Sequence, residues 1–266
     1  MIGSMDITWK GQSSRIREMG SGPPIVLVHG YPLDGAMWSG VARLLSRQFR
    51  VLKPDLPGRG ETAAASAGTV ADYADFLEAI LAGLDAPAGL AGFSMGGYVA
   101  LSLVGRRPER LKALALVDTR AGADDDAGKA RRDEAIAAVK AGGVEAIVEA
   151  MVPRLLDPAS LHNRDLVDRV RRIILRQSRE TVEADLTAMR GRDDSTEGLA
   201  RISIPTLVVV GDHDALTPPA DSQAMASAIP GARLVTIPAA GHLTPMERPG
   251  LVAAALTEFF VDALSP

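Results

Sequence analysis

The stretch from Gly92 to Gly97, with the sequence Gly-Phe-Ser-Met-Gly-Gly, constrains the fold of this chain more than any other. An apolar run at residues 90–93 precedes Ser94, and a helical pattern follows it to about residue 104. A serine on such a strand-to-helix turn takes a strained backbone conformation, which costs roughly 1–3 kcal/mol. Side chains two positions to either side would collide, and Gly92 and Gly96 remove them. The Ser94 hydroxyl is therefore predicted to stand clear of the sheet, at the positive end of a helix dipole.

Size, charge and residue content restrict the class of protein. A chain of 266 residues can form one large α/β domain, or a domain that carries an insertion. The net charge of −4 and the lack of a Lys/Arg-rich run argue against nucleic-acid binding. The absence of cysteine excludes disulfides, thiolate metal sites and a cysteine nucleophile.

The distribution of apolar residues gives no sign of a membrane protein. No apolar run approaches the roughly 20 residues that are needed to cross a bilayer. Residues 1–5 lack the basic segment and apolar core of a signal peptide. We therefore expect a cytoplasmic protein without a membrane partner.

Apolar runs that alternate with helical patterns predict a mostly parallel sheet. Residues 25–28, 113–117 and 206–210 are continuous apolar runs, which are typical of strands buried on both faces. Five further segments complete a predicted set of eight strands: 6–9, 13–18, 51–54, 90–93 and 233–237. Helices are predicted between and after them, at residues 38–45, 70–84, 95–104, 219–228 and 249–264. This alternation implies right-handed crossovers, with helices on both faces of the sheet.

The strand signal disappears between residues 121 and 195. Four helices are predicted there, at residues 128–140, 144–156, 163–178 and 180–190. The third has one apolar stripe, formed by Leu166, Val167, Val170, Ile173 and Ile174. Its other face is basic enough to consider nucleic-acid binding, but the interleaved acids favour a solvated outer face. The sequence therefore predicts a core at residues 1–120 and 196–266, with a helical insertion at 121–195.

Several motifs resemble those of the α/β-hydrolase superfamily. They are His29-Gly30-Tyr31-Pro32 after a strand, the Gly-x-Ser-x-Gly turn around Ser94, the glycine-rich loop 55–62, Gly211-Asp212-His213-Asp214, and the Gly-His-x-x-x-x-Glu-x-Pro stretch from Gly241 to Pro249. The resemblance covers nearly the whole chain and implies an α/β-hydrolase fold. In this family, helices inserted after the sixth strand form a cap over the nucleophile. The insertion at residues 121–195 has the same position.

The resemblance implies a catalytic triad of Ser94, Asp214 and His242. These residues occur in the chain order that the superfamily uses, which is nucleophile, acid, base. A histidine can take the serine proton near neutral pH and return it to the leaving group, while the acid orients the histidine. The family pattern selects Asp214 over Asp212. The main rival is Asp118, which follows the sixth strand, where some relatives have their acid.

The resemblance also implies an oxyanion hole made by backbone N–H groups. The two donors would be the N–H of Tyr31 and the N–H of Met95, the residue after the nucleophile. His29 is interpreted as a buried histidine that fixes this loop. His213 lies beside two acids, but a lone histidine with flexible carboxylates does not define a metal site.

Substrates are expected at the carboxyl ends of the strands, where ligands of open α/β sheets bind. Five apolar residues are candidates to line the substrate pocket: Met151, Leu155, Leu156, Leu216 and Leu243. For Met151, Leu155 and Leu156, an equally good interpretation is that they form the interior of the cap.

The predicted function is hydrolysis of short- to medium-chain carboxylic esters through an acyl-serine intermediate, with no cofactor and no metal. The sequence is similar to carboxylesterases and to 3-oxoadipate enol-lactonase-like proteins. Lactone or enol-lactone hydrolysis, carbon–carbon bond hydrolysis and perhydrolysis remain as alternatives. A ligand-binding receptor on the same fold is the alternative that is not an enzyme. The expected partner is a small-molecule ester, and the sequence gives no indication of oligomeric state.

Overall fold

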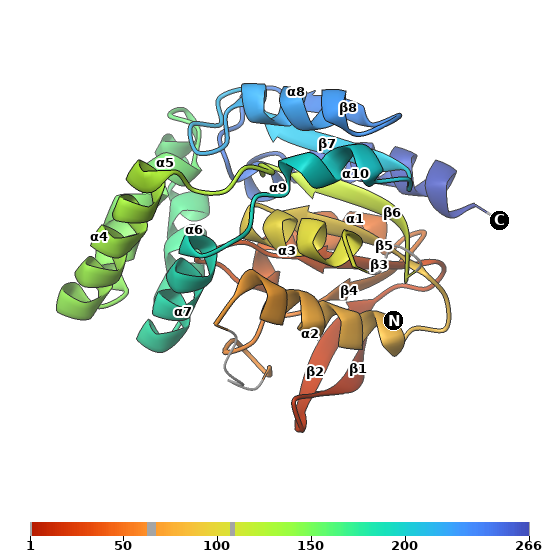
Figure 1. Ribbon diagram of the computed structural model, residues 1–266, viewed down its shortest axis with the longest axis horizontal. Coiled ribbons are helices and arrows are strands. Elements are labelled where there is room, and N and C mark those ends of the chain that lie inside the picture. The colour runs from red at the N-terminus through yellow and green to blue at the C-terminus, as the bar shows by residue number, and fades with distance from the viewer. Residues whose placement is uncertain (1, 63–67, 107–109, 266) are drawn as a thin grey trace.

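A single mixed sheet runs through the protein, as seen in a computed structural model that describes residues 2–62, 68–106 and 110–265 (Figure 1). In these residues, eight strands form the sheet in the order β1-β2-β4-β3-β5-β6-β7-β8. β2 pairs in antiparallel fashion with β1 and β4, and every other neighbouring pair is parallel. The strands are β1 (Ile2–Trp9), β2 (Gln12–Met19), β3 (Pro24–Val28), β4 (Arg50–Lys53), β5 (Ala88–Phe93), β6 (Leu111–Val117), β7 (Thr206–Gly211) and β8 (Arg233–Ile237). The predicted mostly parallel, eight-stranded sheet is confirmed.

Helices cover both faces of this sheet. Helix α1 (Ser39–Leu45) packs against α10 (Pro249–Leu264), and α10 contacts β5, β6 and β8. Helix α2 (Val70–Ala82) packs against α3 (Met95–Val104), which contacts β5 and β6 from the face nearer the viewer in Figure 1. Helix α8 (Pro219–Ala228) packs on β7 and β8. The apolar residues of the central strands are buried between these two layers.

The core elements lie near their predicted positions: β1 begins four residues earlier than predicted, and the others match or differ by one or two residues at an end. The predicted helices at 95–104, 219–228 and 249–264 coincide with α3, α8 and α10. At the start of the predicted helix 38–45, Trp38 is the last residue of a 3-10 turn, η1 (Gly35–Trp38), and α1 begins at Ser39. The Asp34 carboxylate accepts a hydrogen bond from the Ala36 N–H and so caps η1. Strand β5 includes Gly89, although glycine is a poor strand former. A side chain does not fit at this position, because a Cβ there would lie 2.6 Å from the Phe260 ring.

Four helices fill the segment between β6 and β7. They are α4 (Asp126–Gly142), α5 (Glu145–Leu155), α6 (Arg164–Leu175) and α7 (Arg179–Arg190), and they stand together at the left of Figure 1. Helix α4 packs against α5 and α7, and α5 packs against α6. Four residues of the predicted stripe on α6 are buried: Leu166, Val170, Ile173 and Ile174. We call the segment that contains these four helices and their connections, residues 126–190, the candidate cap.

Polar contacts join the candidate cap to loops that follow the parallel strands. Asp34, after β3, bonds to Arg176, and Arg59, after β4, pairs with Asp185 of α7. His213, after β7, contacts Asp157, and the N–H of Leu243, after β8, donates to the Leu155 carbonyl at 2.9 Å. The candidate cap is therefore attached at the carboxyl ends of these strands.

Short helical turns went unpredicted. Besides η1 they are η3 (Ser160–His162), η4 (Thr196–Arg201) and α9 (Thr244–Glu247). Each is too short to show helical periodicity in the sequence.

Candidate active site

The turn between β5 and α3 holds Ser94 in a strained conformation. Ser94 has φ of 50° and ψ of −114°, outside the ordinary regions for a residue with a side chain. A Cβ on Gly92 would lie 2.4 Å from the Gly96 carbonyl oxygen, and a Cβ on Gly96 would lie 2.6 Å from the Val28 carbonyl oxygen. Only glycine fits at both positions, so the sequence motif is explained by the close approach of α3 to β3.

The structure brings the three predicted catalytic residues together. The His242 Nε2 lies 2.9 Å from the Ser94 Oγ, and the His242 Nδ1 lies 2.8 Å from the Asp214 Oδ2. His242 and Asp214 are almost fully buried, whereas Ser94 is half-buried. The Phe93 ring packs against the imidazole at 5.1 Å between centroids. This arrangement can pass a proton from the serine to the imidazole.

The loop after β7 holds Asp214 as a carboxylate. Its Oδ1 accepts hydrogen bonds from the N–H groups of Leu216 and Thr217, and its Oδ2 accepts one from the Thr217 hydroxyl at 2.7 Å. Burial raises the pKa of Asp214, but the His242 ring and the Thr217 bonds outweigh it, so the pKa is below its ordinary value. Sequence reasoning missed Thr217, although its place three residues after Asp214 fits a local side-chain-to-backbone turn.

The rival acid, Asp118, lies in a different position. Its Oδ1 accepts the Gly211 N–H at 3.0 Å, and its Oδ2 accepts the Thr244 hydroxyl. Burial, followed by repulsion from Asp214, raises the pKa of Asp118 well above its ordinary value. Asp118 thus ties the end of β6 to the loops that carry Asp214 and His242, and it is Asp214 that contacts the imidazole.

The loop after β3, which contains Tyr31, packs against Ser94 through Gly30. A Cβ on Gly30, the preceding residue, would lie 2.9 Å from the Ser94 Cβ. His29 is buried, its Nε2 accepts the Leu56 N–H at 3.0 Å, and its Nδ1 lies 3.0 Å from the Gly30 carbonyl oxygen. Because Nε2 is an acceptor, the ring is neutral with its proton on Nδ1. Burial, and then the nearby Arg59 charge, lower the pKa of His29 to about 3.

A buried carboxylate, Glu247, supports the loop that carries His242. It accepts the Gly241 N–H at 2.9 Å and the Asp157 N–H at 2.8 Å, so it joins this loop to the chain that leaves α5. A Cβ on Gly241 would lie 2.5 Å from the Asp157 nitrogen, which explains the glycine before the histidine. Glu247 belongs to the predicted Gly-His-x-x-x-x-Glu-x-Pro stretch. Its hydrogen bond to Asp157 of the candidate cap could not be predicted from the sequence.

The five predicted pocket residues differ in burial. Leu155, Leu156 and Leu243 are fully buried within the hydrophobic core, while Met151 and Leu216 are only partly buried. Met151 and Leu216 therefore have side-chain surface left for a ligand, and the lining of the pocket stays a prediction.

A large surface pocket lies away from these residues. It has a volume of about 780 Å³ and is lined by α2, α3 and residues 191–204, with side chains of both charges. Ser94, Asp214 and His242 do not line it.

Residues 2–62, 68–106 and 110–265 contain neither a cluster of metal-ligating side chains nor a membrane-spanning helix. No group of three His, Asp or Glu side chains there is arranged to hold a metal ion. No helix in that part of the chain is long and apolar enough to cross a membrane.

Comparison with known proteins identifies the family. The sequence model for the alpha/beta hydrolase fold matches residues 23–249. The chain therefore belongs to the α/β-hydrolase family. Within this family it is similar to esterases and to an enol-lactonase.

Two curated relatives have similar sequences. A pimeloyl-[acyl-carrier protein] methyl ester esterase of Neisseria meningitidis is 29% identical over 94% of this chain and 99% of its own length. The dihydrolipoyllysine-residue acetyltransferase component of an acetoin cleaving system of Pseudomonas putida is 32% identical over 89% of this chain. The match spans only 64% of the length of that acetyltransferase component.

Two solved structures extend the comparison. A thermophilic esterase from Thermogutta terrifontis, solved with malate bound, has a TM-score of 0.92 and 38% identity, over 99% of this chain and 100% of its own. The enol-lactonase from Burkholderia xenovorans has a TM-score of 0.88 and 25% identity, over 97% of this chain and 100% of its own. The resemblance thus covers both the core and the candidate cap.

Proposed function

We propose that this protein hydrolyses short- to medium-chain carboxylic esters through an acyl-serine intermediate. The observation that carries the proposal is the chain of contacts from the Ser94 Oγ to His242 at 2.9 Å and from His242 to Asp214 at 2.8 Å. The similarity to two esterases supports the same class of reaction.

The first half of the reaction forms the acyl-enzyme. The Ser94 Oγ attacks the ester carbonyl carbon while its proton passes to the His242 Nε2, and the Asp214 carboxylate stabilises the imidazolium. The negative oxygen of the tetrahedral intermediate would accept hydrogen bonds from the N–H groups of Tyr31 and Met95. Collapse of this intermediate breaks the carbon–oxygen bond of the ester, and His242 gives its proton to the departing alcohol.

The second half releases the acid. His242 takes a proton from water, and the resulting hydroxide adds to the acyl carbon. The bond to the Ser94 Oγ then breaks, and the proton returns to Ser94. This cycle uses only side-chain and backbone groups of the chain, so no cofactor is part of the proposal.

A candidate cap that encloses the site limits the size of the acyl group. Each buried methylene is worth about 0.8 kcal/mol, or about fourfold in kcat/KM. Overfilling the enclosed volume typically costs about 1–3 kcal/mol. The partly buried Met151 and Leu216 are the candidates for this contact, and we expect efficiency to rise over the first few carbons and to fall for long chains.

The test is a series of p-nitrophenyl esters from acetate to palmitate, with Ser94→Ala as the matched control. We expect saturable turnover of the short and medium esters by the wild type and none by the variant. Best activity on palmitate would contradict the enclosed site. Saturable binding without turnover by the wild type would favour the receptor alternative.

A second candidate function is hydrolysis of lactones or enol-lactones. The similarity to an enol-lactonase over 97% of this chain favours it as the runner-up. The mechanism is the same, except that the leaving hydroxyl is part of the acyl chain, so deacylation by water releases one hydroxy acid, or one keto acid from an enol-lactone, and no separate alcohol. Measuring kcat/KM for lactones and enol-lactones beside the linear esters decides between the two, because the natural class should give the larger value.

A further inference from the structure

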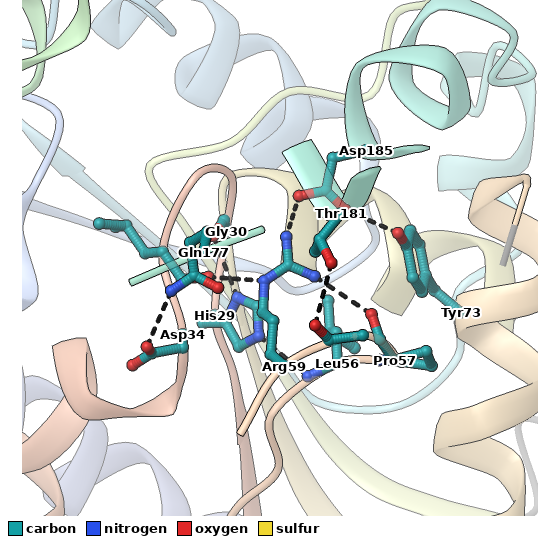
Figure 2. A network of polar contacts seen from close by, with 12 residues as sticks. His29, Gly30, Asp34, Leu56, Pro57, Arg59, Tyr73, Gln177, Thr181 and Asp185 are labelled. Carbon is teal, nitrogen blue, oxygen red and sulfur yellow. Dashed lines mark hydrogen bonds and ion pairs between the residues drawn. The ribbon is translucent and has the colours of Figure 1, made fainter. Parts of the chain in front are cut away.

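A buried ion pair joins the candidate cap to the glycine-rich loop that follows β4. Arg59 of the glycine-rich loop pairs with Asp185 of α7, and both side chains have no exposed surface (Figure 2). The Tyr73 hydroxyl of α2 donates to the other oxygen of Asp185 at 2.6 Å. A buried ion pair carries a large desolvation cost and is weak evidence of a stabilising role. The presence of this buried ion pair therefore needs an explanation other than stability.

Arg59 holds the turn that contains Tyr31. Its Nε donates to the Leu33 carbonyl at 3.0 Å, and the Leu33 N–H donates to the Gly30 carbonyl at 2.9 Å. Residues 30–33 thus form one closed turn, with Tyr31 inside it and Gly30 packed against Ser94. A shift of this turn would move the Tyr31 N–H relative to the reacting carbonyl oxygen.

The candidate cap fixes the same turn at its other end. The Arg176 Nε and Nη2 bond to the two carboxylate oxygens of Asp34 at 2.5 Å each, and the Gln177 Nε2 donates to Asp34 at 3.0 Å. Figure 2 shows Asp34 with Gln177 on one side of this turn and Arg59 with Asp185 on the other. The turn is thus attached to the candidate cap directly through Asp34 and indirectly through Arg59.

We propose that Arg59 and Asp185 are positioning residues, which make the oxyanion-binding geometry of the Tyr31 turn depend on the docking of α7. The proposal rests on the function proposed above, because it assigns the Tyr31 N–H to the oxyanion hole. Asp185 fixes the guanidinium, the guanidinium fixes the Leu33 carbonyl, and the turn presents its N–H to the developing negative charge. An interaction of this kind is strongest in the transition state, so its loss lowers kcat more than it raises KM.

The first test replaces the whole polar group, so that no buried charge is left unpaired. The triple variant Arg59→Met, Tyr73→Phe, Asp185→Leu keeps similar volumes and removes the donor to Leu33. Mispositioning one oxyanion donor is expected to lower kcat by about 10- to 100-fold, below the loss for deleting such a donor. We expect KM to change by less than about threefold, since the ester is still bound in its ground state.

A matched pair of substrates separates positioning from general damage. A thionoester replaces the carbonyl oxygen by sulfur, which accepts hydrogen bonds poorly, so the ratio of ester to thionoester turnover reports on the oxyanion hole. We expect this ratio to fall along with kcat in the triple variant. The control Glu18→Leu, Arg50→Met removes a half-buried ion pair between β2 and β4, and should leave the ratio unchanged.

The outcomes distinguish this inference from the proposed function. If the wild type fails to hydrolyse any ester, the proposed function is wrong. If the wild type is active and depends on Ser94, but the triple variant keeps its kcat and its substrate ratio, only the positioning role is overturned. Should the triple variant not fold, Asp185→Asn, which keeps the shape of the side chain and removes its charge, is measured instead. A substrate ratio that stays at the wild-type value in folded Asp185→Asn would equally overturn the inference.

Discussion

Ser94 shows at the scale of one residue how the backbone sets up the chemistry. Its φ of 50° is held by the contacts of Gly92 and Gly96, where added Cβ atoms would meet backbone oxygens at 2.4 and 2.6 Å. Backbone atoms cannot move aside as a flexible side chain can. The strain at Ser94 is therefore maintained by the backbone packed around Gly92 and Gly96.

The two glycines give a stability prediction. Gly92→Ala and Gly96→Ala should each lower the free energy of unfolding by about 1–3 kcal/mol or more, since overpacking against backbone forces the turn to shift. Gly250→Ala is the control, because a Cβ there meets no atom within 4 Å. Urea denaturation of the three variants is the measurement. Equal stability of Gly96→Ala and Gly250→Ala would refute the close packing of the turn.

Asp214 and Asp118 are both buried acids, but only Asp214 contacts His242. Asp214→Asn should lower kcat on the order of 10⁴-fold, as expected for loss of the acid that orients the histidine. Asp118→Asn should lower it by less than about tenfold, because the Asp118 carboxylate bonds to Gly211 and Thr244 and not to the imidazole, and asparagine keeps an acceptor for the Gly211 N–H. Steady-state kinetics compares the two with Asp212→Asn. If Asp118→Asn is the most damaging of the three, the assigned acid is wrong.

His29 gives a prediction about acid stability. Burial lowers the pKa of His29 from 6.5 to about 3. Between these two pH values the unfolded chain therefore binds a proton at His29, whereas the folded chain does not. The free energy of unfolding should therefore fall as the pH drops from about 6.5 towards 3, by up to about 1.4 kcal/mol per pH unit for this group. His29→Gln, which retains an acceptor for Leu56, should show a shallower slope. Parallel slopes for wild type and variant in urea titrations would exclude a neutral His29.

At the scale of elements, the loops at the carboxyl ends of the strands are joined to the candidate cap by polar contacts. One contact connects His213, whose side chain is 58% exposed, to the buried Asp157 after α5. The bond to Asp157, and then the charge of Asp212, raise the pKa of His213. The bond to His213 in turn lowers the pKa of Asp157. This contact should consequently strengthen when the histidine is protonated.

The contribution of the His213–Asp157 contact to the free energy of unfolding depends on pH. Because the pKa of His213 is raised in the fold, its contribution is fully present below about pH 6.5 and is lost as the pH rises through the folded value. Because the pKa of Asp157 is lowered, the contact is also lost in strong acid. His213→Gln should differ from the wild type most in mildly acidic solution and least above neutrality. A difference in unfolding free energy that grows from pH 6 to pH 9 would contradict this.

The sequence predicted the long elements well, because each has many residues on one periodic pattern. Helices α3, α8 and α10 and strand β8 have the predicted bounds. The short helical turns η3, η4 and α9 were not predicted, because a segment of three to six residues cannot show a helical period. The ends of β6 and β7 shifted by one or two residues, since hydrogen bonds to neighbouring strands, which are non-local, decide where a strand stops.

At the scale of the whole molecule, the fold gathers residues that are far apart in the chain. Ser94, Asp214 and His242 could be predicted because each belongs to a local motif that follows a strand. The contacts of Arg59 with Asp185, and of Glu247 with Asp157, could not, because they join segments 126 and 90 residues apart whose own sequences carry no signal of the pairing. Such contacts follow from the docking of the candidate cap on the core, which periodicity does not encode.

The most direct measurement of the proposed chemistry locates the nucleophile. The wild type and Ser94→Ala are treated with a fluorophosphonate, and the adduct is mapped by peptide mass spectrometry beside an ester hydrolysis assay. We predict one adduct per chain of the wild type, on Ser94, with loss of activity in proportion to labelling, and neither labelling nor activity in a folded Ser94→Ala variant. An adduct on another residue, or ester hydrolysis that survives in Ser94→Ala, would contradict catalysis through an acyl-enzyme at Ser94.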